Sequence, residues 1–432
     1  MQSKFAKQTY SKECFNARTF AGMQVVIDIL QRDGYDVDFA SSATVNKYDV
    51  VLVSITSDCD WWDYIAERSR WSKGHYKVIV GGAGVLNVRP FLSTADYFVL
   101  GRAEGVITPL VKTIESGNKC IDNHIIESSR FDVNSKYQIN QTDVVYPHTI
   151  TLQNGKTYHE DTIGCNHKCF YCGYTWQRKH DRCGEFEYSG LWNGGADRER
   201  AMIDMDAGVD VDLNKLRTTA IDGMSERLRF MANKKISSDM LRNFIGNLAR
   251  CEKPHQVKFY NIIGYPNETI EDWMEFKRDI QSVDSTMARS DKQTSILLHS
   301  TPFRAMPATP WACKPMSYKN YRGEIGRRLG VGLKGNIFYQ GNAMWAVESM
   351  ATDSLSSVML SAIVWRGTEV DYCNMLKIAQ SKKFWSSSSM VKQKTLEAYF
   401  NMPEYFRELS YDELPTRYLG SYFDVEKSIR QQ

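Results

Sequence analysis

Short apolar runs alternate with amphipathic segments over the first third of the chain. Apolar residues three or four positions apart predict a helix over residues 19–33, and alternating apolar and polar residues predict a strand over residues 35–40. The continuous apolar runs at residues 49–55 and 77–80 are typical of buried parallel strands. A further strand and helix follow. Strands that alternate with helices predict a doubly wound, Rossmann-like α/β domain over residues 1–140.

The same alternation continues along the middle of the chain and gives way to helical patterns in the last quarter. The predicted strands are residues 149–152, 201–206, 218–221, 257–263 and 295–299. The predicted helices of the tail are residues 354–364, 369–381 and 392–401. We therefore expect a second α/β domain over residues 141–315 and a mostly helical region over residues 316–432.

The composition of the chain indicates a cellular compartment but does not indicate a substrate. The 432 residues are 42% hydrophobic and 24% charged, as in soluble globular proteins, and the net charge of +3 is too small to indicate nucleic-acid binding. No apolar run approaches the ~20 residues that span a bilayer, and the first residues lack the apolar core of a signal peptide. The ten cysteines form no regular framework, so we expect a reducing, cytoplasmic location without membrane contact.

Three cysteines stand within eight residues near the middle of the chain. They are Cys165, Cys169 and Cys172. The polar residues between them make poor core material, and thiolates are good ligands for soft metals. Iron–sulfur clusters normally take four cysteines, so three predict a four-iron cluster with one open iron. The alternative is a zinc site completed by His167, His180 or Cys183.

The spacing of these cysteines, with aromatic Tyr171 before the third, resembles the signature loop of the radical S-adenosylmethionine (radical SAM) enzymes. In that family a [4Fe-4S] cluster binds the amino and carboxylate groups of SAM at its open iron. An electron, supplied by a reductant of the flavodoxin or ferredoxin type, then cleaves SAM to methionine and a 5′-deoxyadenosyl radical. The resemblance implies a partial (β/α)6 barrel over residues 141–315, preceded by the Rossmann-like domain.

The resemblance extends to two later segments, residues 218–229 and 257–269. The residues that it places around SAM are Tyr171, Gly173, Asp204, Asp206, Asp222, Ser225, Arg227, Arg229, Ile263 and Gly264. It implies that Tyr171 lies against the adenine, that Asp222 bonds the ribose, and that the strand ending at Gly264 offers its backbone to the adenine. Shielding the cluster from water is the alternative role of Tyr171.

The remaining ligands of SAM carry alternatives. Asp204 and Asp206 stand where the family often has a Gly-Gly-Glu triplet that holds the ammonium, although solvated carboxylates explain them equally well. Ser225, Arg227 or Arg229 would meet the carboxylate, because a guanidinium pairs two-to-two with that group. An exposed helix face rich in charge is the alternative.

The glycine turn at residues 81–84 and the later Gly101–Gly105 segment resemble the cobalamin-binding domain of one radical SAM branch. The Asp-x-His-x-x-Gly motif that ligates cobalt in some of these domains is absent. Cobalamin binding is therefore one expectation, and a degenerate domain kept for packing or for substrate binding is the other. A tight turn that needs no ligand also explains the glycines.

Two residues near the end of the last predicted strand of the barrel are candidates to face the substrate. They are His299 and Arg304. A lone histidine at a strand end is more often structural. Basic residues among aromatics in the tail, such as Lys392 near Trp385, suit either a nucleic-acid groove or an ordinary amphipathic surface.

Taken together, these features predict an enzyme that modifies or rearranges an unactivated carbon by radical SAM chemistry. The best match for the substrate is a base of DNA or RNA, as in related enzymes that modify tRNA and hypermodified phage DNA. One alternative is a cobalamin-dependent C-methyltransferase acting on a small molecule. A second, of another class, is a metal-binding module without catalytic activity.

Overall fold

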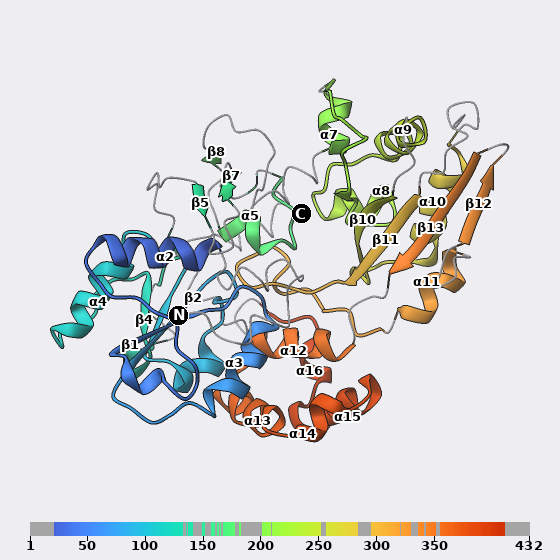
Figure 1. Ribbon diagram of the computed structural model, residues 1–432. Coiled ribbons are helices and arrows are strands. Elements are labelled where there is room, and N and C mark those ends of the chain that lie inside the picture. Colours follow the sequence, from blue (N-terminus) through green and yellow to red (C-terminus); the bar gives the residue numbers. More distant parts are fainter. Residues whose placement is uncertain are drawn as a thin grey trace.

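The computed structural model describes most of the chain between residues 21 and 410 (Figure 1). The described residues are 21–132, 135, 137–140, 149–151, 157–159, 162–163, 165, 167–177, 181–182, 201–208, 210–251, 256–283, 295–319, 321–329, 336–340, 343–350 and 355–410. Within these ranges no helix combines the length and the apolar character that a membrane span needs. The architecture is mixed α/β, with two sheets that are largely parallel.

The N-terminal sheet has four strands, which follow one another in the order β1-β2-β3-β4. They are β1 (Val50–Ser54), β2 (Lys77–Gly81), β3 (Tyr97–Val99) and β4 (Ile125–Glu127), with β4 antiparallel to β3. Its helices and turns are α2 (Ala21–Arg32), η2 (Val45–Lys47), α3 (Asp60–Arg68), η3 (Arg89–Thr94), α4 (Ile107–Glu115) and η4 (Ser128–Arg130). The strand predictions at residues 49–55 and 77–80 and the helix prediction at 19–33 are confirmed in position.

One prediction for this region is not confirmed and another is corrected. A doubly wound sheet reverses its strand order at a switch point, whereas the described strands follow one another in chain order across the sheet, so the doubly wound topology is not confirmed. Residues 35–40, predicted as a strand, lie outside any strand. The Asp38 carboxylate accepts a bond from the backbone of Phe39 (2.7 Å), and such local bonds compete with a strand ladder.

The middle sheet has five strands in the order β12-β13-β11-β10-β9. They are β9 (Thr218–Ala220), β10 (Gln256–Ile263), β11 (Ser295–Pro302), β12 (Asn336–Gln340) and β13 (Ala343–Met350). All pair in parallel except β12, which is antiparallel to β13. Among the described residues the sheet is open, so the predicted partial barrel is not confirmed. The strands β12 and β13 also extend this sheet beyond the predicted boundary at residue 316.

Helices pack on one face of the middle sheet. They are α8 (Glu226–Met231), α9 (Ser238–Ala249), α10 (Ile270–Gln281) and α11 (Arg322–Leu329). Side chains along β10 and β11 alternate, so that Phe259 and Leu298 are buried in the core with these helices, whereas Tyr260 and His299 point to the other, partly exposed face. That second face is therefore accessible to a ligand.

Residues 201–206 form a helix, α7 (Ala201–Asp206), where a strand was predicted. Helix α7 lies against α9, with Ala201 and Met202 buried in the same core. Alanine and methionine favour helices, and these six residues contain few of the β-branched residues that favour strands. The smaller described elements are β5 (Thr149–Thr151), β6 (Thr157–His159), β7 (Thr162–Ile163), α5 (Gly173–Gln177) and β8 (Asp181–Arg182).

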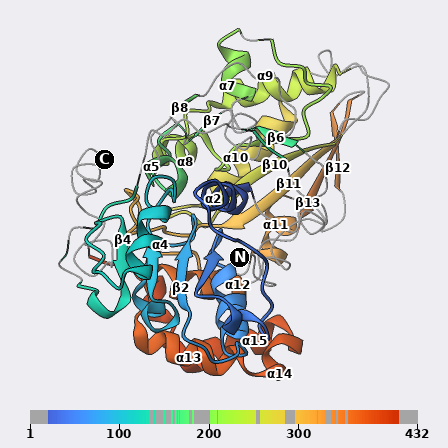
Figure 2. The same ribbon diagram turned by 60° about the vertical axis from the view of Figure 1, so that its left-hand side comes forward.

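The predicted helices of the tail are confirmed and pack beneath the N-terminal sheet (Figures 1 and 2). They are α12 (Leu355–Arg366), α13 (Glu369–Ala379), α14 (Lys382–Ser386), α15 (Ser389–Phe400) and α16 (Pro403–Phe406). Helix α13 lies against α3 and η3. A single hydrophobic core joins the N-terminal sheet to α12 and α13, so the first and last parts of the chain fold together.

Candidate functional site

The described part of the cysteine loop is residues 165 and 167–172. Cys165 and Cys169 are buried and Cys172 is half-buried. The hydroxyl of Thr175 donates to the Cys165 carbonyl (2.6 Å), and the indole of Trp176 donates to the Cys169 carbonyl (2.8 Å). Helix α5, which begins at Gly173, thus folds back over the loop and holds two of the three cysteines by their backbone.

The loop is docked on the carboxyl edge of the middle sheet. Its Phe170 N–H donates to the Ala232 carbonyl (3.0 Å) at the end of α8, and its Phe170 carbonyl accepts from Trp311 N–H (3.0 Å) beyond β11. The Asn233 side chain donates to the Lys168 carbonyl (2.8 Å). These contacts place the cysteine loop beside the segments that follow β9 and β11.

A buried ion pair lies next to the loop. The ammonium of Lys234, only 1% exposed, is 2.9 Å from the carboxylate of Asp222, which follows β9. Asp222 has a positive φ of 48° and Asn233 one of 58°, so two left-handed residues turn the chain to bring the pair together. A buried charge pair of this kind is costly to desolvate, so each member depends on the other for its charge to stay buried.

Two tyrosines complete the surroundings of the pair. The Tyr265 hydroxyl donates to the Asp222 carbonyl (2.8 Å), and the rings of Tyr171 and Tyr265 lie 6.0 Å apart. Burial raises the pKa of both tyrosines well above its usual value, and the nearby Asp222 carboxylate adds to that rise. Both phenols are therefore neutral beside the ion pair.

The donor chemistry of the loop suits an iron–sulfur cluster. Burial raises the pKa of the Cys169 thiol to about 12, and the Lys234 ammonium opposes that rise. Metal binding would deprotonate such a thiol, as metal ligation does generally. Among the described residues no three His, Cys, Asp or Glu side chains are placed to share one metal ion. Since a four-iron cluster takes each thiolate on its own iron, it does not require that convergence.

The predicted ligands of the SAM carboxylate all have partners inside the protein. Ser225 caps α8 and donates to Asp272 (2.5 Å), and Arg227 forms an ion pair with the same carboxylate (2.6 Å). Arg229 is fully buried and donates to the Ile236 carbonyl (2.7 Å). These contacts do not support a ligand role for the three side chains, because each is already used to join α8 to its neighbours.

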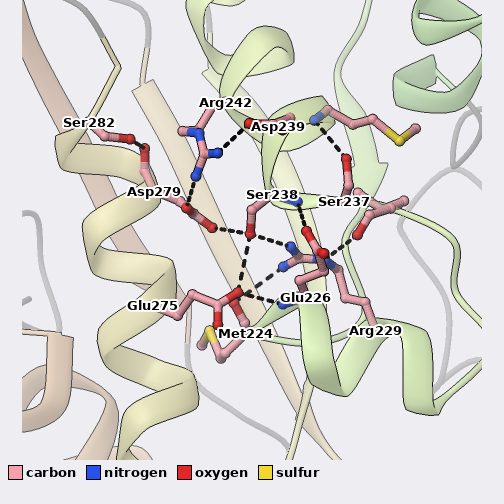
Figure 3. Close-up of polar contacts among 12 residues, drawn as sticks. Met224, Glu226, Arg229, Ser237, Ser238, Asp239, Arg242, Glu275, Asp279 and Ser282 are labelled. Atoms are coloured by element: carbon pink, nitrogen blue, oxygen red, sulfur yellow. Dashed lines mark hydrogen bonds and ion pairs between the residues drawn. The ribbon is translucent and has the colours of Figure 1, made fainter.

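Figure 3 shows a polar network around Arg229 and Ser238 that joins α8, α9 and α10. Arg229 also donates to Ser238 (3.1 Å), whose hydroxyl lies 2.8 Å from Asp279. Arg242 forms a further ion pair with Asp279 (2.6 Å). A hollow of about 690 Å³ opens over these helices, lined by members of the network. The side chains that line this hollow are bonded to one another, so we assign the network a structural role.

The strand end at Ile263 and Gly264 has little free space around it. Gly264 has a φ of +77°, and a Cβ added there would meet the Ser317 hydroxyl and would lie 2.5 Å from the Tyr321 hydroxyl. The Glu268 carboxylate accepts from Gly264 N–H (2.7 Å), and burial raises its pKa. Glycine is therefore required here by the fold. Because the Gly264 N–H is already bonded to Glu268, the predicted backbone contact to adenine would have to be made by a carbonyl.

The other predicted residues lie in three different places. Asp204 is half-buried and Asp206 exposed on α7, a helix where a strand end was expected. His299 packs edge-on against Tyr260 (5.2 Å) on the partly exposed face of the middle sheet. Arg304 forms an ion pair with Asp58 of the N-terminal domain (3.0 Å), which gives it a role in joining domains. His180 and Cys183, the alternative zinc ligands, lie outside the described residues.

Sequence reasoning missed Lys234, Tyr265 and Glu268. Lys234 belongs to a Lys-Lys pair that is typical of an exposed helix end, and only its turn through Asn233 carries it inward. Glu268 stands in the Glu-Thr segment that we matched to the family, but its function as an acceptor for the strand end was not assigned. A signal was present for Tyr265 and Glu268, because both lie within the matched segment 257–269, whereas Lys234 lies five residues beyond the matched segment 218–229.

No family model matches the sequence, and no curated protein matches it. Among solved structures, the chain is similar to the radical S-adenosylmethionine methyltransferase TsrM from Kitasatospora setae, solved with cobalamin and a [4Fe-4S] cluster bound. The two share 14% identity over 68% of this chain and 71% of that chain, with a TM-score of 0.42.

The chain is also similar to OxsB, a cobalamin-dependent S-adenosylmethionine radical enzyme. With aqua-cobalamin and S-adenosylmethionine bound, OxsB shares 9% identity over 95% of this chain and 54% of that chain, with a TM-score of 0.21. The apo form of OxsB shares 8% identity over 95% of this chain and 50% of that chain, with a TM-score of 0.20. This chain thus spans about half the length of OxsB. TM-scores this low do not establish a shared fold.

Proposed function

We propose that this protein is a radical SAM enzyme, with Cys165, Cys169 and Cys172 as the cluster ligands. The observation that carries the proposal is the docking of the cysteine loop on the carboxyl edge of the middle sheet. There the loop lies beside the buried pair of Asp222 and Lys234. A chance grouping of cysteines would not be expected to meet the strand ends that the family pattern names.

When bound, a [4Fe-4S] cluster and SAM would supply the reductive cleavage of SAM to methionine and a 5′-deoxyadenosyl radical. The chain itself would hold the cluster by three thiolates and exclude water with Tyr171 and Tyr265. Lys234 would balance negative charge beside Cys169 and fix the carboxylate of Asp222, which the family pattern assigns to the ribose. A dry, apolar pocket limits side reactions of a reactive radical.

The proposal is tested by anaerobic reconstitution of the full chain with iron and sulfide, followed by dithionite and SAM. We expect about four iron atoms per chain and the formation of 5′-deoxyadenosine. Cys169→Ala should lose the cluster and the product together. Cys373→Ala is the matched control, since Cys373 is an exposed thiol on α13 and should leave both unchanged.

The outcome separates two classes of protein. A chain that binds neither four irons nor SAM, and instead retains one zinc ion after metal-free purification steps, would be a binding module without radical chemistry. Iron binding without 5′-deoxyadenosine would also contradict the proposal. Zinc content is measured on the same samples, so both alternatives are judged in one experiment.

For the substrate, we propose a base of DNA or RNA. The support is a basic and aromatic surface on the tail helices, where the Lys392 ammonium lies 5.6 Å from the ring centre of Phe384 and 6.0 Å from that of Trp385. Trp385 is 37% exposed and Tyr399 48% exposed, so both rings can be reached. Stacking on exposed aromatics beside cations is how sequence-tolerant nucleic-acid sites are built.

Binding of single-stranded and duplex oligonucleotides at several salt concentrations tests the substrate class. Affinity should fall with salt, and the double variant Lys392→Gln with Trp385→Ala should weaken binding at every concentration. Lys112→Gln on α4 changes one cation of the N-terminal domain and serves as the control. Equal affinity for both variants would rule out the tail surface as the binding site.

A further inference from the structure

The glycine turn after β2 is filled by the protein's own backbone. Gly82 has a φ of +115°, and a Cβ added there would collide with the Ile55 carbonyl oxygen. At Gly84 an added Cβ would lie 2.9 Å from the Ser57 carbonyl oxygen, and the Gly84 N–H donates to the Ile55 carbonyl (2.9 Å). The glycines therefore allow the turn after β2 to pack against the segment after β1.

The same closure occurs at the end of β3. Gly101 has a φ of +84°, and a Cβ added there would lie 2.5 Å from the Asn140 carbonyl oxygen. Asn140 N–H donates to the Leu100 carbonyl (2.8 Å), and its side chain donates to the Arg102 carbonyl (2.8 Å). The Gly101–Gly105 segment is thus bound by a later part of the chain.

The tail helices cover the remaining part of this edge. Asn87, 1% exposed, donates from its side chain to the carbonyls of Val364 (3.2 Å) and Gly367 (3.1 Å) at the end of α12. The last carbonyls of a helix lack intrahelical donors, so this side chain satisfies groups that would otherwise need water. On the other side, Asp58 accepts bonds from Arg304 and from Ser361 of α12.

From these three closures we infer that the carboxyl edge of the N-terminal sheet is an internal docking surface for the tail helices and does not hold cobalamin. Ligands of parallel α/β sheets bind at this edge. Here Gly82 and Gly84, after β2, pack against the backbone that follows β1, and Gly101, after β3, packs against the backbone of Asn140. The residues present therefore do not fit the cofactor. The inference removes the cobalamin-dependent alternative, and it does not depend on the proposed radical SAM activity.

The direct test adds hydroxocobalamin to the reconstituted full chain, removes the excess by gel filtration and records the visible spectrum. We expect no cobalamin to elute with the protein. Co-elution at about one cobalamin per chain would overturn the inference. Iron content and 5′-deoxyadenosine are measured on the same sample, so a failure of the proposed function would be seen separately.

Thermal unfolding tests the positive half of the inference. Asn87→Ala should lower the midpoint of unfolding clearly, because two buried carbonyls at the end of α12 lose their donor. Asn118→Ala is the matched control, since Asn118 bonds only at the exposed surface of the same domain. If both variants unfold at the wild-type temperature, the edge is not a docking surface and the inference fails.

Discussion

The negative charge of the Asp222 carboxylate, near Cys169, is balanced by the buried Lys234. We expect Lys234→Met to lower the free energy of unfolding by about 3–5 kcal/mol, because the Asp222 carboxylate would stay buried without its partner. Urea unfolding measures this loss. Formation of 5′-deoxyadenosine should be abolished in the same variant.

The double variant Asp222→Asn with Lys234→Met separates folding from function. A neutral pair leaves no uncompensated charge, so most of the lost stability should return. SAM cleavage should stay absent, since neither the carboxylate nor the ammonium is restored. Full activity in the double variant would show that the pair has only a structural role.

A sequence pattern could identify the thiols at this site but not the lysine. Three cysteines in eight residues are a local signal that needs no fold. The position of Lys234 depends on the left-handed Asn233 and on the end of α8, which no short motif specifies. Its neighbour Lys235 is exposed, so two adjacent lysines with equal local patterns have opposite environments.

Helix α8 carries two arginines whose surroundings differ. Arg229 is fully buried and Arg227 has a side chain that is 50% exposed. We expect Arg229→Met to lower the free energy of unfolding by about 3 kcal/mol or more, since several backbone carbonyls lose a charged donor. Arg227→Met should lower it by a smaller amount, about 1–2 kcal/mol, because the buried Asp272 carboxylate keeps its bonds from Ser225 and Thr269.

Chemical denaturation of both variants, with SAM affinity measured alongside, decides the role of Arg229. A stable Arg229→Met variant with weakened SAM binding would return this residue to the cofactor site. A larger loss of stability in Arg229→Met than in Arg227→Met, with SAM affinity unchanged in Arg229→Met, supports a structural role for the buried guanidinium.

Helix α3 gives the stability of the protein a dependence on pH. Burial raises the pKa of the Asp63 carboxyl from 3.8 to about 7, and the nearby Asp60 carboxylate adds to the rise. Between these values the native state keeps a proton that the unfolded chain has lost, so stability falls as pH rises. At 1.36 kcal/mol per unit, the wild type should lose on the order of 2–4 kcal/mol relative to Asp63→Asn across that range.

Urea unfolding of the two proteins at pH values from 4 to 8 measures this difference, which should grow up to about pH 7 and then level off. Curves that stay parallel over the whole range would mean that Asp63 titrates alike in both states. The sign is opposite to that of a salt-bridged carboxylate, whose stabilising effect is lost at low pH.

At the scale of elements, the sequence predicted those helices and strands whose formation depends on residues close together in the chain. The tail helices, the continuous apolar strands β1 and β2, and the strand β10 were found from local composition and spacing of apolar residues. Helix α7 was missed because six residues give no period. The pairing of β13 with β11 was also missed, since it joins residues about fifty positions apart and depends on the rest of the sheet.

At the scale of the whole molecule, the two ends of the chain form one structural unit. The core of the N-terminal sheet includes Met359, Ile363 and Trp365 of α12, and the carboxyl edge of that sheet also receives Arg304 from beyond β11. The cysteine loop touches the same segment through Trp311. The position of the candidate site therefore depends on the docking of the tail, although the tail contains none of the predicted cluster ligands.

The junction of Asp58, Arg304 and Ser361 provides the last test, because Arg304 was predicted to face the substrate. Its side chain is 19% exposed and that of Asp58 is 12% exposed. We expect Arg304→Met to lower the free energy of unfolding by about 2–4 kcal/mol, less than a fully buried pair because some solvent reaches it. Arg304→Met with Asp58→Asn should recover part of that loss, since no lone carboxylate remains. Calorimetry of the three proteins measures these differences. A catalytic role predicts the reverse: Arg304→Met would unfold at the wild-type temperature and would convert no substrate, while 5′-deoxyadenosine would still form.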